Sequence, residues 1–238
     1  MGSPAMRLAA LVPMRHHSQR VTGKNYRVLG GRPLFHHVLQ TLQQVPEIHE
    51  IAVDTDSPII VDGLQHHFPA VRLILRPDHL RGDSIPMNEI LLHDVAVVGA
   101  DHYLQTHSTN PLVKPQTFSR AINTYLSGLA VHDSLFSVTR RQSRFYDAQG
   151  EPLNHDPREL LQTQDLPPVY EENSCLYLFS GGVLRANRHR IGRTPALFEI
   201  DAAEAWDIDH EVDIEICQFL IEHGSGRAAP GGSLSSEG

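Results

Sequence analysis

Three cationic side chains fall within ten residues of one another near the start of the chain. They belong to the segment PMRHHSQRVTGKN (13–25), which overlaps the end of the apolar run LAALVPM (8–14). The segment supplies Arg15, Ser18, Arg20, Lys24 and Asn25. Arginine presents a fork of N–H donors and lysine a compact charge, which together suit a triphosphate. The spacing is not that of a Walker A loop, and a solvent-exposed basic turn is the alternative interpretation.

A second feature that could carry chemistry is a pair of alternating carboxylates in the segment AWDIDHEVDIEI (205–216). Asp207 and Asp209 are two residues apart, so in an extended segment both point to the same face. Two neighbouring carboxylates repel unless a cation lies between them, and Mg²⁺ prefers oxygen ligands together with phosphate. The pair therefore predicts a magnesium site. The alternative makes Asp209 the N-cap of a following helix and Asp207 an exposed polar residue.

The elements that must position these residues alternate between strand and helix patterns. Apolar runs predict strands at 8–14, 50–56, 71–75, 102–106, 135–139, 175–181 and 196–200. Helices are predicted at 33–45, from Pro58, at 86–99, at 115–129 and at 211–223. We therefore expect an α/β fold with a mostly parallel, doubly wound (Rossmann-like) nucleotidyltransferase sheet. Ligands of such sheets bind beyond the carboxyl ends of the strands, which selects the loops after Met14, Leu75 and Gln105.

Residues 140–172 interrupt this alternation. They are polar and rich in Pro and Gln, and they show little periodicity. We interpret them as a small arm that makes dimer contacts and closes the site. Residues 6–223 then form one domain, residues 1–5 are interpreted as an expression remnant, and residues 224–238, which are poor in apolar side chains, are expected to be disordered.

Composition excludes several classes of partner. The formal net charge of −8 lacks the broad basic field that nucleic-acid and anionic-membrane binding need. No apolar run approaches the ~20 residues of a membrane-spanning helix. Cys175 and Cys217 lie among apolar neighbours without the spacing of a disulfide framework or a metal site, which favours buried thiols and a cytoplasmic location. Most of the 16 histidines are expected at the surface, including the pair His36-His37 in a predicted helix.

An ordered series of motifs also runs through the chain. The pattern A-x-x-x-x-R-x-x-S-x-x-x-x-x-K-N is matched by Ala10, Arg15, Ser18, Lys24 and Asn25. It continues as L-x-G-x-P-L, matched by LGGRPL (29–34). Over nearly all of residues 8–223 the chain thereby resembles the acylneuraminate cytidylyltransferases, also called CMP-sialic acid synthetases.

Four later segments resemble further motifs of that family. The segment LRPDHLRGDSIPMNEILLH (75–93) is similar to the family's cytidine segment. Its matching residues are Arg76, Asp83 and Ser84. The turn Q-x-T-S-P-L is matched by Gln105 and TNPL (109–112), the motif Y-E-N by Tyr170, Glu172 and Asn173, and the motif D-I-D by residues 207–209.

The resemblance implies a reaction and a role for each matched residue. CMP would pass from CTP to the anomeric oxygen of a sialic-acid-like 2-keto sugar acid, with release of pyrophosphate, in a Mg²⁺-dependent homodimer. The catalytic residues would be Arg15, Lys24, Asp207 and Asp209. CTP would contact Arg15, Ser18, Arg20, Lys24, Asn25, Arg76, Asp83 and Ser84. The sugar acid would contact Gln105, Arg158, Gln164, Tyr170, Glu172 and Asn173.

Two departures from the family pattern leave the acceptor open. The turn QTHSTNP (105–111) is two residues longer than the family's, and RELLQTQD (158–165) contains one basic residue where members acting on sialic acid often carry several. Kdo, a legionaminic-type sugar and a phosphonate are therefore alternative acceptors. A nucleotide-binding regulator without catalysis is the alternative from another class, although such a protein has no need of the paired carboxylates.

Overall fold

The computed structural model describes residues 6–18 and 21–223. The predictions made for residues 1–5, Arg20 and residues 224–238 lie outside this part of the chain. No helix within the described ranges has the length and apolar character needed to cross a membrane.

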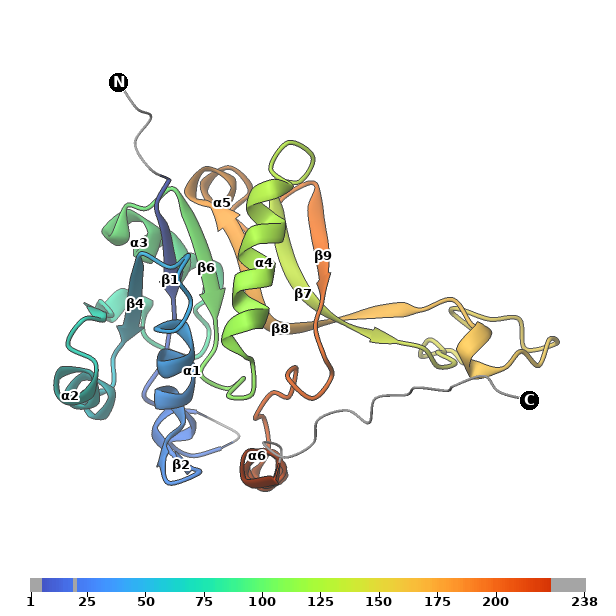
Figure 1. Cartoon of the computed structure of the whole chain (residues 1–238), viewed down its shortest axis with the longest axis horizontal. Coiled ribbons are helices and arrows are strands. Elements are labelled where there is room, and N and C mark those ends of the chain that lie inside the picture. Colours follow the sequence, from blue (N-terminus) through green and yellow to red (C-terminus); the bar gives the residue numbers. More distant parts are fainter. Residues whose placement is uncertain (1–5, 19–20, 224–238) are drawn as a thin grey trace, which may run out of the picture.

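Seven strands form one sheet in the order β5-β4-β1-β6-β8-β7-β9 (Figure 1). They are β1 (Leu8–Leu11), β4 (Glu50–Thr55), β5 (Arg72–Leu75), β6 (His102–Thr106), β7 (Ser134–Arg141), β8 (Val169–Ser180) and β9 (Pro195–Glu199). All pairings are parallel except those of β8, which lies antiparallel between β6 and β7. The expected mostly parallel α/β sheet is confirmed.

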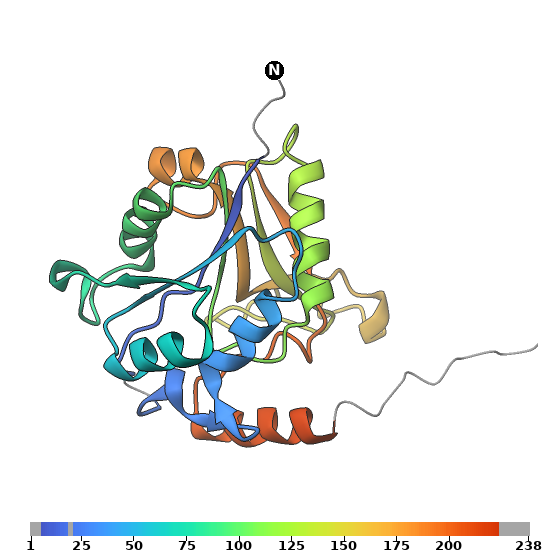
Figure 2. The same ribbon diagram turned by 60° about the vertical axis from the view of Figure 1, so that its left-hand side comes forward.

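Helices cover both faces of this sheet (Figure 2). They are α1 (Leu34–Leu42), α2 (Pro58–His67), α3 (Met87–Val98), α4 (Pro115–Ser127), α5 (Gly181–Asn187) and α6 (Glu211–His223). The apolar sides of α1, α2 and α4 pack in the core of one face, and those of α3 and α5 pack in the core of the other. The doubly wound arrangement follows from this division.

The alternation of side chains along β1 shows why a short apolar run makes a central strand. Leu8 and Ala10 point into the core beneath α1 and α4, whereas Ala9 and Leu11 point into the core beneath α3 and α5. All four are buried, as a strand covered on both faces requires. The carboxyl end of β1 therefore lies between the ends of β4 and β6, with which it pairs.

The polar segment 140–172 leaves the sheet as a long projection (Figure 1). Strands β7 and β8 continue beyond the core as a ribbon, which ends where Arg141 pairs with Val169. A short 3-10 turn, η3 (Thr163–Asp165), lies in the outer part. The ribbon contains an irregularity between Phe136 and Val138, close to Ser174 with its positive φ of 59°.

A small substructure that the sequence patterns did not predict follows β1. It consists of the 3-10 turn η1 (Lys24–Tyr26) and the hairpin β2 (Val28–Leu29) and β3 (Arg32–Pro33). Elements of two or three residues are too short to show a periodicity, so they escape pattern analysis. The hairpin turns at Gly30 and Gly31, whose φ angles of 56° and 79° suit glycine.

The hairpin anchors the last helix to the first half of the chain. Leu29 and Leu34 form a small buried cluster with Ile208 and Cys217. The backbone N–H of Gly30 donates to Oε1 of Gln218 at 2.6 Å. The segment that precedes α6 is thereby packed against the loop after β1.

The expectation that the His36-His37 pair lies at the surface was wrong. The two residues are 8% and 5% exposed, and the ring of His36 packs against Phe35 and Phe68. The Nε2 atom of His37 lies 2.9 Å from the carbonyl oxygen of Leu29. Burial lowers the pKa of both imidazoles, so neutral rings fill this part of the core.

Candidate active site

Six of the predicted site residues line one cavity of about 290 Å³ at the carboxyl edge of the sheet. They are Arg15, Ser18, Lys24, Asn25, Arg76 and Asp209. The same cavity is lined by His107, Thr109, Gly82 and the apolar side chains of Ile85, Met87 and Ile90. The loops after β1, β5 and β6 therefore meet, as the parallel topology requires.

Asn25 fixes the backbone of the cationic loop. Its Nδ2 donates to the carbonyl oxygen of Arg15 at 2.7 Å, and its Oδ1 accepts from the hydroxyl of Ser108 at 2.7 Å. Asn25 is buried, so these two hydrogen bonds replace those that water would make. The guanidinium of Arg15 then forms an ion pair with Asp83, which links the loop after β1 to the loop after β5.

Lys24 connects this loop to the segment before α6. Its Nζ lies 2.7 Å from the carbonyl oxygen of Ile208 and 3.1 Å from Oδ1 of Asp209. The backbone N–H of Ile208 donates in turn to the carbonyl oxygen of Thr109 at 2.9 Å. Three segments far apart in the sequence thus fix the positions of a lysine and a carboxylate at one wall of the cavity.

The second carboxylate of the predicted pair, Asp207, opens toward a neighbouring cavity of about 420 Å³ that Glu172, Asn173 and Trp206 also line. One of its oxygens, Oδ1, is buried and has no hydrogen-bond partner among the described residues. Burial raises the pKa of Asp207, a hydrogen bond from the Thr109 side chain lowers it in part, and the nearby Asp209 carboxylate raises it again. A carboxylate oxygen that is desolvated and unsatisfied in this way fits a divalent cation as its missing partner.

The start of α6 receives its capping interactions from Asp213. Its Oδ2 accepts the backbone N–H groups of Asp209 and His210 at 2.9 and 2.6 Å. Because Asp213 lies in the first turn of the helix, this arrangement is the reciprocal half of a capping box. A carboxylate other than Asp209 therefore satisfies these N–H groups.

Beneath the cavity, Arg76 belongs to a buried charged cluster. Its guanidinium forms an ion pair with Asp54, and the two side chains are 4% and 0% exposed. Asp94 of α3 lies against this pair, and its own Oδ1 is 3.2 Å from Nδ1 of His93. Burial raises the pKa of Asp94 to about 9, with the negative charge of Asp54 as the second cause. One guanidinium therefore faces two carboxyl groups that share a proton at neutral pH.

Two residues of the site had not been predicted. His107, in the lengthened turn after β6, lines the cavity, and its Nε2 lies 3.0 Å from Nε2 of Gln105. Arg190, in the loop between α5 and β9, donates to Oε1 of Gln105 at 2.5 Å. The extra length of the turn after β6 was a sequence signal that could have pointed to His107 as a site residue. Arg190 lies in an irregular loop, and no motif marks it.

The structure distributes the predicted sugar residues over three places. Gln105 is fully buried behind His107. Glu172 and Asn173 line the cavity beside Asp207. The side-chain oxygen of Asn173 accepts a hydrogen bond from the Ser137 hydroxyl, and its side-chain nitrogen donates one to Thr139.

Tyr170 is 43% exposed at the base of the arm. Arg158 and Gln164 lie on the arm, where Arg158 pairs with Asp156 at 2.6 Å. Within this one chain the structure does not bring these two arm residues to the cavity. Ser84, predicted near cytidine, is exposed beside Asp83.

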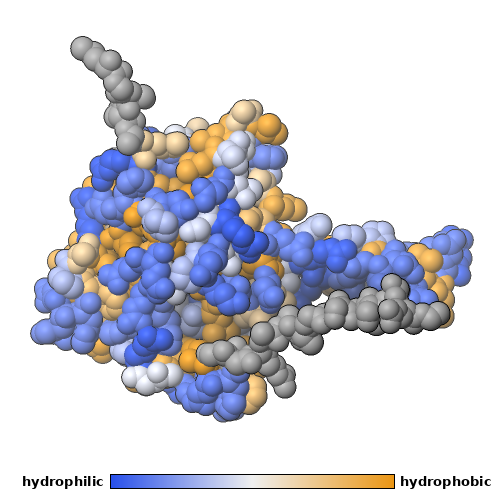
Figure 3. All heavy atoms as spheres, in the orientation of Figure 1, coloured by the Kyte–Doolittle hydropathy of each residue, from blue (hydrophilic) through white to orange (hydrophobic). Residues whose placement is uncertain are grey.

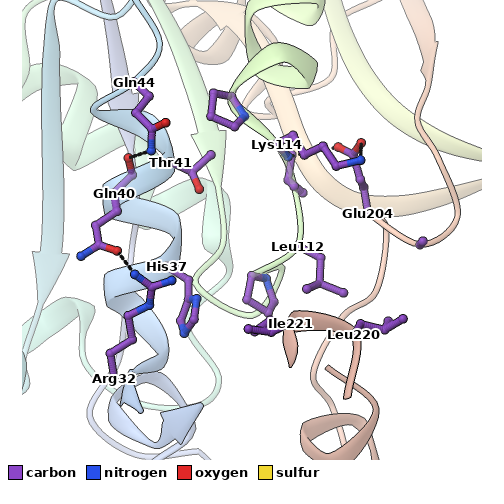
Figure 4. A pocket seen from close by; sticks show the side chains of 14 residues that line it. Arg32, His37, Gln40, Thr41, Gln44, Leu112, Lys114, Glu204, Leu220 and Ile221 are labelled. Carbon is purple, nitrogen blue, oxygen red and sulfur yellow. Dashed lines mark hydrogen bonds and ion pairs between the residues drawn. The ribbon is translucent and has the colours of Figure 1, made fainter. Parts of the chain in front are cut away.

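A larger cavity of about 490 Å³ lies elsewhere, between α1, α6 and the start of α4 (Figure 4). Its walls include Gln40, Leu112 and Ile221, and Lys114 and Glu204 face each other across one side (Figure 4). It contains none of the predicted site residues. The residue chemistry, rather than the volume, identifies the candidate site.

A doubly wound sheet with a cation-lined cavity and acidic side chains at its carboxyl edge is typical of a nucleotidyltransferase. The chain belongs to the cytidylyltransferase family, whose model matches residues 9–223. This match covers the loop after β1, the cavity and both carboxylates of the pair.

Relatives with established names agree with this family. The chain is 28% identical to a CMP-N,N'-diacetyllegionaminic acid synthase of Legionella pneumophila over 91% of this chain and 97% of the relative. It is 24% identical to an N-acylneuraminate cytidylyltransferase of Escherichia coli over 88% of this chain and 51% of the relative. The fold is similar to that of a CMP:2-keto-3-deoxy-manno-octonic acid synthetase solved with CTP, with a TM-score of 0.69, 16% identity and 92% and 99% of the two chains covered.

Proposed function

We propose that this cytidylyltransferase joins CMP from CTP to the anomeric oxygen of a sialic-acid-like 2-keto sugar acid and releases pyrophosphate. The observation that carries the proposal is the meeting of Arg15, Lys24 and Asp209 at one cavity, beside the unsatisfied buried oxygen of Asp207. Cations next to an acidic pair suit a triphosphate attacked at its α-phosphorus.

In this proposal the loop after β1 holds the part of CTP that leaves. Arg15, Ser18 and Lys24 bind the β- and γ-phosphates, while Asn25 holds the backbone of Arg15 in place. The charges of Arg15 and Lys24 stabilise pyrophosphate as the bond to the α-phosphorus breaks. Arg20, which lies outside the described residues, is assigned to the same group from its place in the sequence. Positioning supplies most of the catalysis in transfers of this kind.

The nucleoside is assigned to the wall that the loop after β5 forms. Arg76 enters the cavity from the end of β5 and is held by Asp54, so its direction is fixed before a ligand binds. Together with Asp83 and Ser84 it is assigned to cytidine. Ile85, Met87 and Ile90 add an apolar surface of the kind that a base or ribose packs against.

Asp207 and Asp209 are the residues that would hold Mg²⁺. The buried and unpartnered Oδ1 of Asp207 is the feature of this chain that fits such an ion. When bound, Mg²⁺ would offset the charge of the α-phosphate and favour ionisation of the attacking hydroxyl. Asp213 would hold this segment in place by capping α6.

The acceptor is assigned to the cavity beside Asp207, which Glu172 and Asn173 line. A legionaminic-type acid is the second candidate, because the Legionella relative aligns over almost its whole length. Kdo remains a third, supported by a 3-deoxy-manno-octulosonate cytidylyltransferase of Escherichia coli that is 29% identical over 50% of this chain and 44% of the relative.

We also propose a homodimer and a cytoplasmic location. The arm exposes Leu153, Leu160 and Tyr146 at 62%, 91% and 52%. Figure 3 shows hydrophobic side chains among hydrophilic ones toward its outer end. Apolar groups on a projection suit contact with a second copy. The two cysteines are free and buried, which is compatible with a reducing compartment.

The experiment that tests the function is pyrophosphate release from CTP and Mg²⁺. The acceptors are N-acetylneuraminic acid, N,N'-diacetyllegionaminic acid and 3-deoxy-manno-octulosonate, each with a control lacking acceptor. We expect acceptor-dependent release with at least one acid and a CMP-sugar product by mass spectrometry. Tight CTP binding without release for any acid would favour the non-catalytic alternative.

A further inference from the structure

Arg190 is held from three sides in a defined position. Its Nη1 donates to Oε1 of Gln105 on β6 at 2.5 Å, and its Cζ lies 3.5 Å from the centroid of the Tyr177 ring on β8. Its backbone N–H donates to Oδ1 of Asn88 on α3 at 3.2 Å. A guanidinium stacked on an aromatic face keeps its remaining N–H donors in one plane.

This guanidinium has no carboxylate partner. Among the described residues, none places a carboxylate oxygen within 4.0 Å of Arg190, whereas the buried Arg76 pairs directly with Asp54. Burial lowers the pKa of Arg190, which shows that the surroundings disfavour its charge. Tyr177 and, after it, Glu172 partly offset this lowering of the pKa, and the Glu172 carboxylate accepts the hydroxyl of Tyr177. A cation desolvated without a counterion is costly, and an anionic ligand would remove that cost.

Arg190 is not among the residues that line either cavity, but its contacts reach the linings of both. Through Gln105 it reaches His107, which lines the cavity of about 290 Å³ that we assign to CTP, the nucleotide cavity. Through Tyr177 it reaches Glu172, which lines the cavity beside Asp207.

The charges around His107 also bear on how Arg190 could bind an anion. Burial lowers the pKa of His107 to about 3, and the positive charges of Arg190 and Lys24 contribute. A neutral imidazole therefore lies near two cations, of which Lys24 is paired with Asp209 and Arg190 has no carboxylate partner among the described residues.

We propose that Arg190 binds the carboxylate of the acceptor, by a forked pair of hydrogen bonds from the face of Tyr177. The inference rests on the proposed function, because it takes the acceptor to be a 2-keto acid. The sequence assigned Arg158 to the sugar acid, but Arg158 is paired with Asp156 on the arm, so another residue is needed for the carboxylate. Nucleotide binding, by contrast, is assigned to Arg15, Lys24 and Arg76 and does not require Arg190.

The test compares Arg190→Gln and Arg190→Lys with a matched control, Arg193→Gln, which removes an exposed arginine from the same loop. The acceptor is whichever of the three named sugar acids supports release by the wild type. For Arg190→Gln we expect the KM for that acid to rise roughly 30-fold or more, the scale of a lost charged hydrogen bond. The KM for CTP and the melting temperature should stay close to wild type. Arg190→Lys should recover part of the loss, and Arg193→Gln should behave as wild type.

A second measurement separates contact from mere packing. The carboxamide of the same sugar acid is tested as an inhibitor, and its inhibition constant is compared with the KM of the acid. The wild type should prefer the acid strongly, and Arg190→Gln should lose most of that preference. An unchanged acid-to-amide preference, or a rise in the KM for CTP alone, would overturn the assignment while leaving the reaction intact. Absence of release by the wild type with every acid would overturn the proposed function itself.

Discussion

Lys24 and Asp209 are 185 residues apart in the sequence, yet the Nζ of one lies 3.1 Å from Oδ1 of the other. Their side chains are 15% and 36% exposed, so this pair is less screened than an ordinary surface ion pair. The contact closes the loop after β1 onto the segment before α6. It places the cation that we assign to the phosphates next to a carboxylate that we assign to the metal, a combination that suits transfer at an α-phosphate.

The first prediction concerns the charge of Asp209. Asp209→Asn keeps the shape of the side chain but weakens both the bond to Lys24 and the proposed metal site. We expect turnover to fall by roughly 10² or more, which corresponds to several kcal/mol of lost charge stabilisation. Kinetics with CTP and acceptor measure this, and added Mg²⁺ should recover part of the activity.

A matched control for that substitution is Asp213→Asn, four residues further on. Asp213 caps α6, so its loss should lower the melting temperature with a smaller effect on turnover. If Asp209→Asn retained full activity at ordinary Mg²⁺, the assigned role of Asp209 would be wrong.

The second prediction concerns Asp94, whose folded pKa of about 9 exceeds the ordinary value of 3.8. Between these values the unfolded chain has released a proton that the folded chain retains. The contribution of Asp94 to stability is therefore complete below pH 3.8 and is lost as the pH rises toward 9. The slope is up to about 1.4 kcal/mol per pH unit. Asp94→Asn, which stays neutral, should flatten this dependence and be more stable than wild type at pH 8.

Urea unfolding at pH 6, 7 and 8 measures the effect in both proteins. Asp78→Asn, which alters a carboxylate that is 90% exposed and paired with Arg81, is the control and should leave the slope unchanged. Parallel pH dependences for the wild type and Asp94→Asn would contradict a shared proton in this cluster.

The third prediction is a preference for CTP. Arg76 is aimed into the nucleotide cavity by its buried pair with Asp54, and the chain belongs to the cytidylyltransferase family. We expect kcat/KM for CTP to exceed that for UTP, ATP and GTP by roughly tenfold or more, the scale of one discriminating hydrogen bond. Equal turnover of CTP and UTP would remove the basis for placing cytidine at this wall.

The fourth prediction is a homodimer that depends on the arm. Light scattering at micromolar concentration should give twice the mass of one chain. Replacing the exposed Leu153 and Leu160 together by Glu should shift the protein toward the monomer, because charges would then be buried at the contact. Val131→Glu alters a residue that is 70% exposed away from the arm, and it should leave the mass unchanged. A monomeric wild type would count against the arm as a dimer contact.

The elements of the sheet were predictable because their signals are local. The continuous apolar run at 8–14 and the helical face of 33–45 specify a buried strand and a covering helix wherever they occur. The start of α2 was predictable for the same reason, since Ser57 caps it through the N–H of Ile60 and Pro58 takes the first position. The cationic loop and the acidic pair were visible as residue types at fixed spacing.

Other features depended on which segments the topology brings together. The burial of His36 and His37 reflects their packing against neighbouring elements, and two adjacent histidines in a helix do not indicate which face is covered. The burial of Asp94 against Asp54 joins a helix to a strand that precedes it by about 40 residues, and neither residue belongs to a motif.

By itself, the sequence determined the α/β class, the family motifs and six of the residues that line the nucleotide cavity. The tertiary structure decided that Lys24 meets Asp209, that Asp213 caps α6, and that Arg190 lies on Tyr177 without a carboxylate partner among the described residues. The physical reason is that periodicity and capping depend on neighbours a few residues away. Burial, charge pairing and shifted pKa values depend on groups that only the folded sheet brings within a few ångströms.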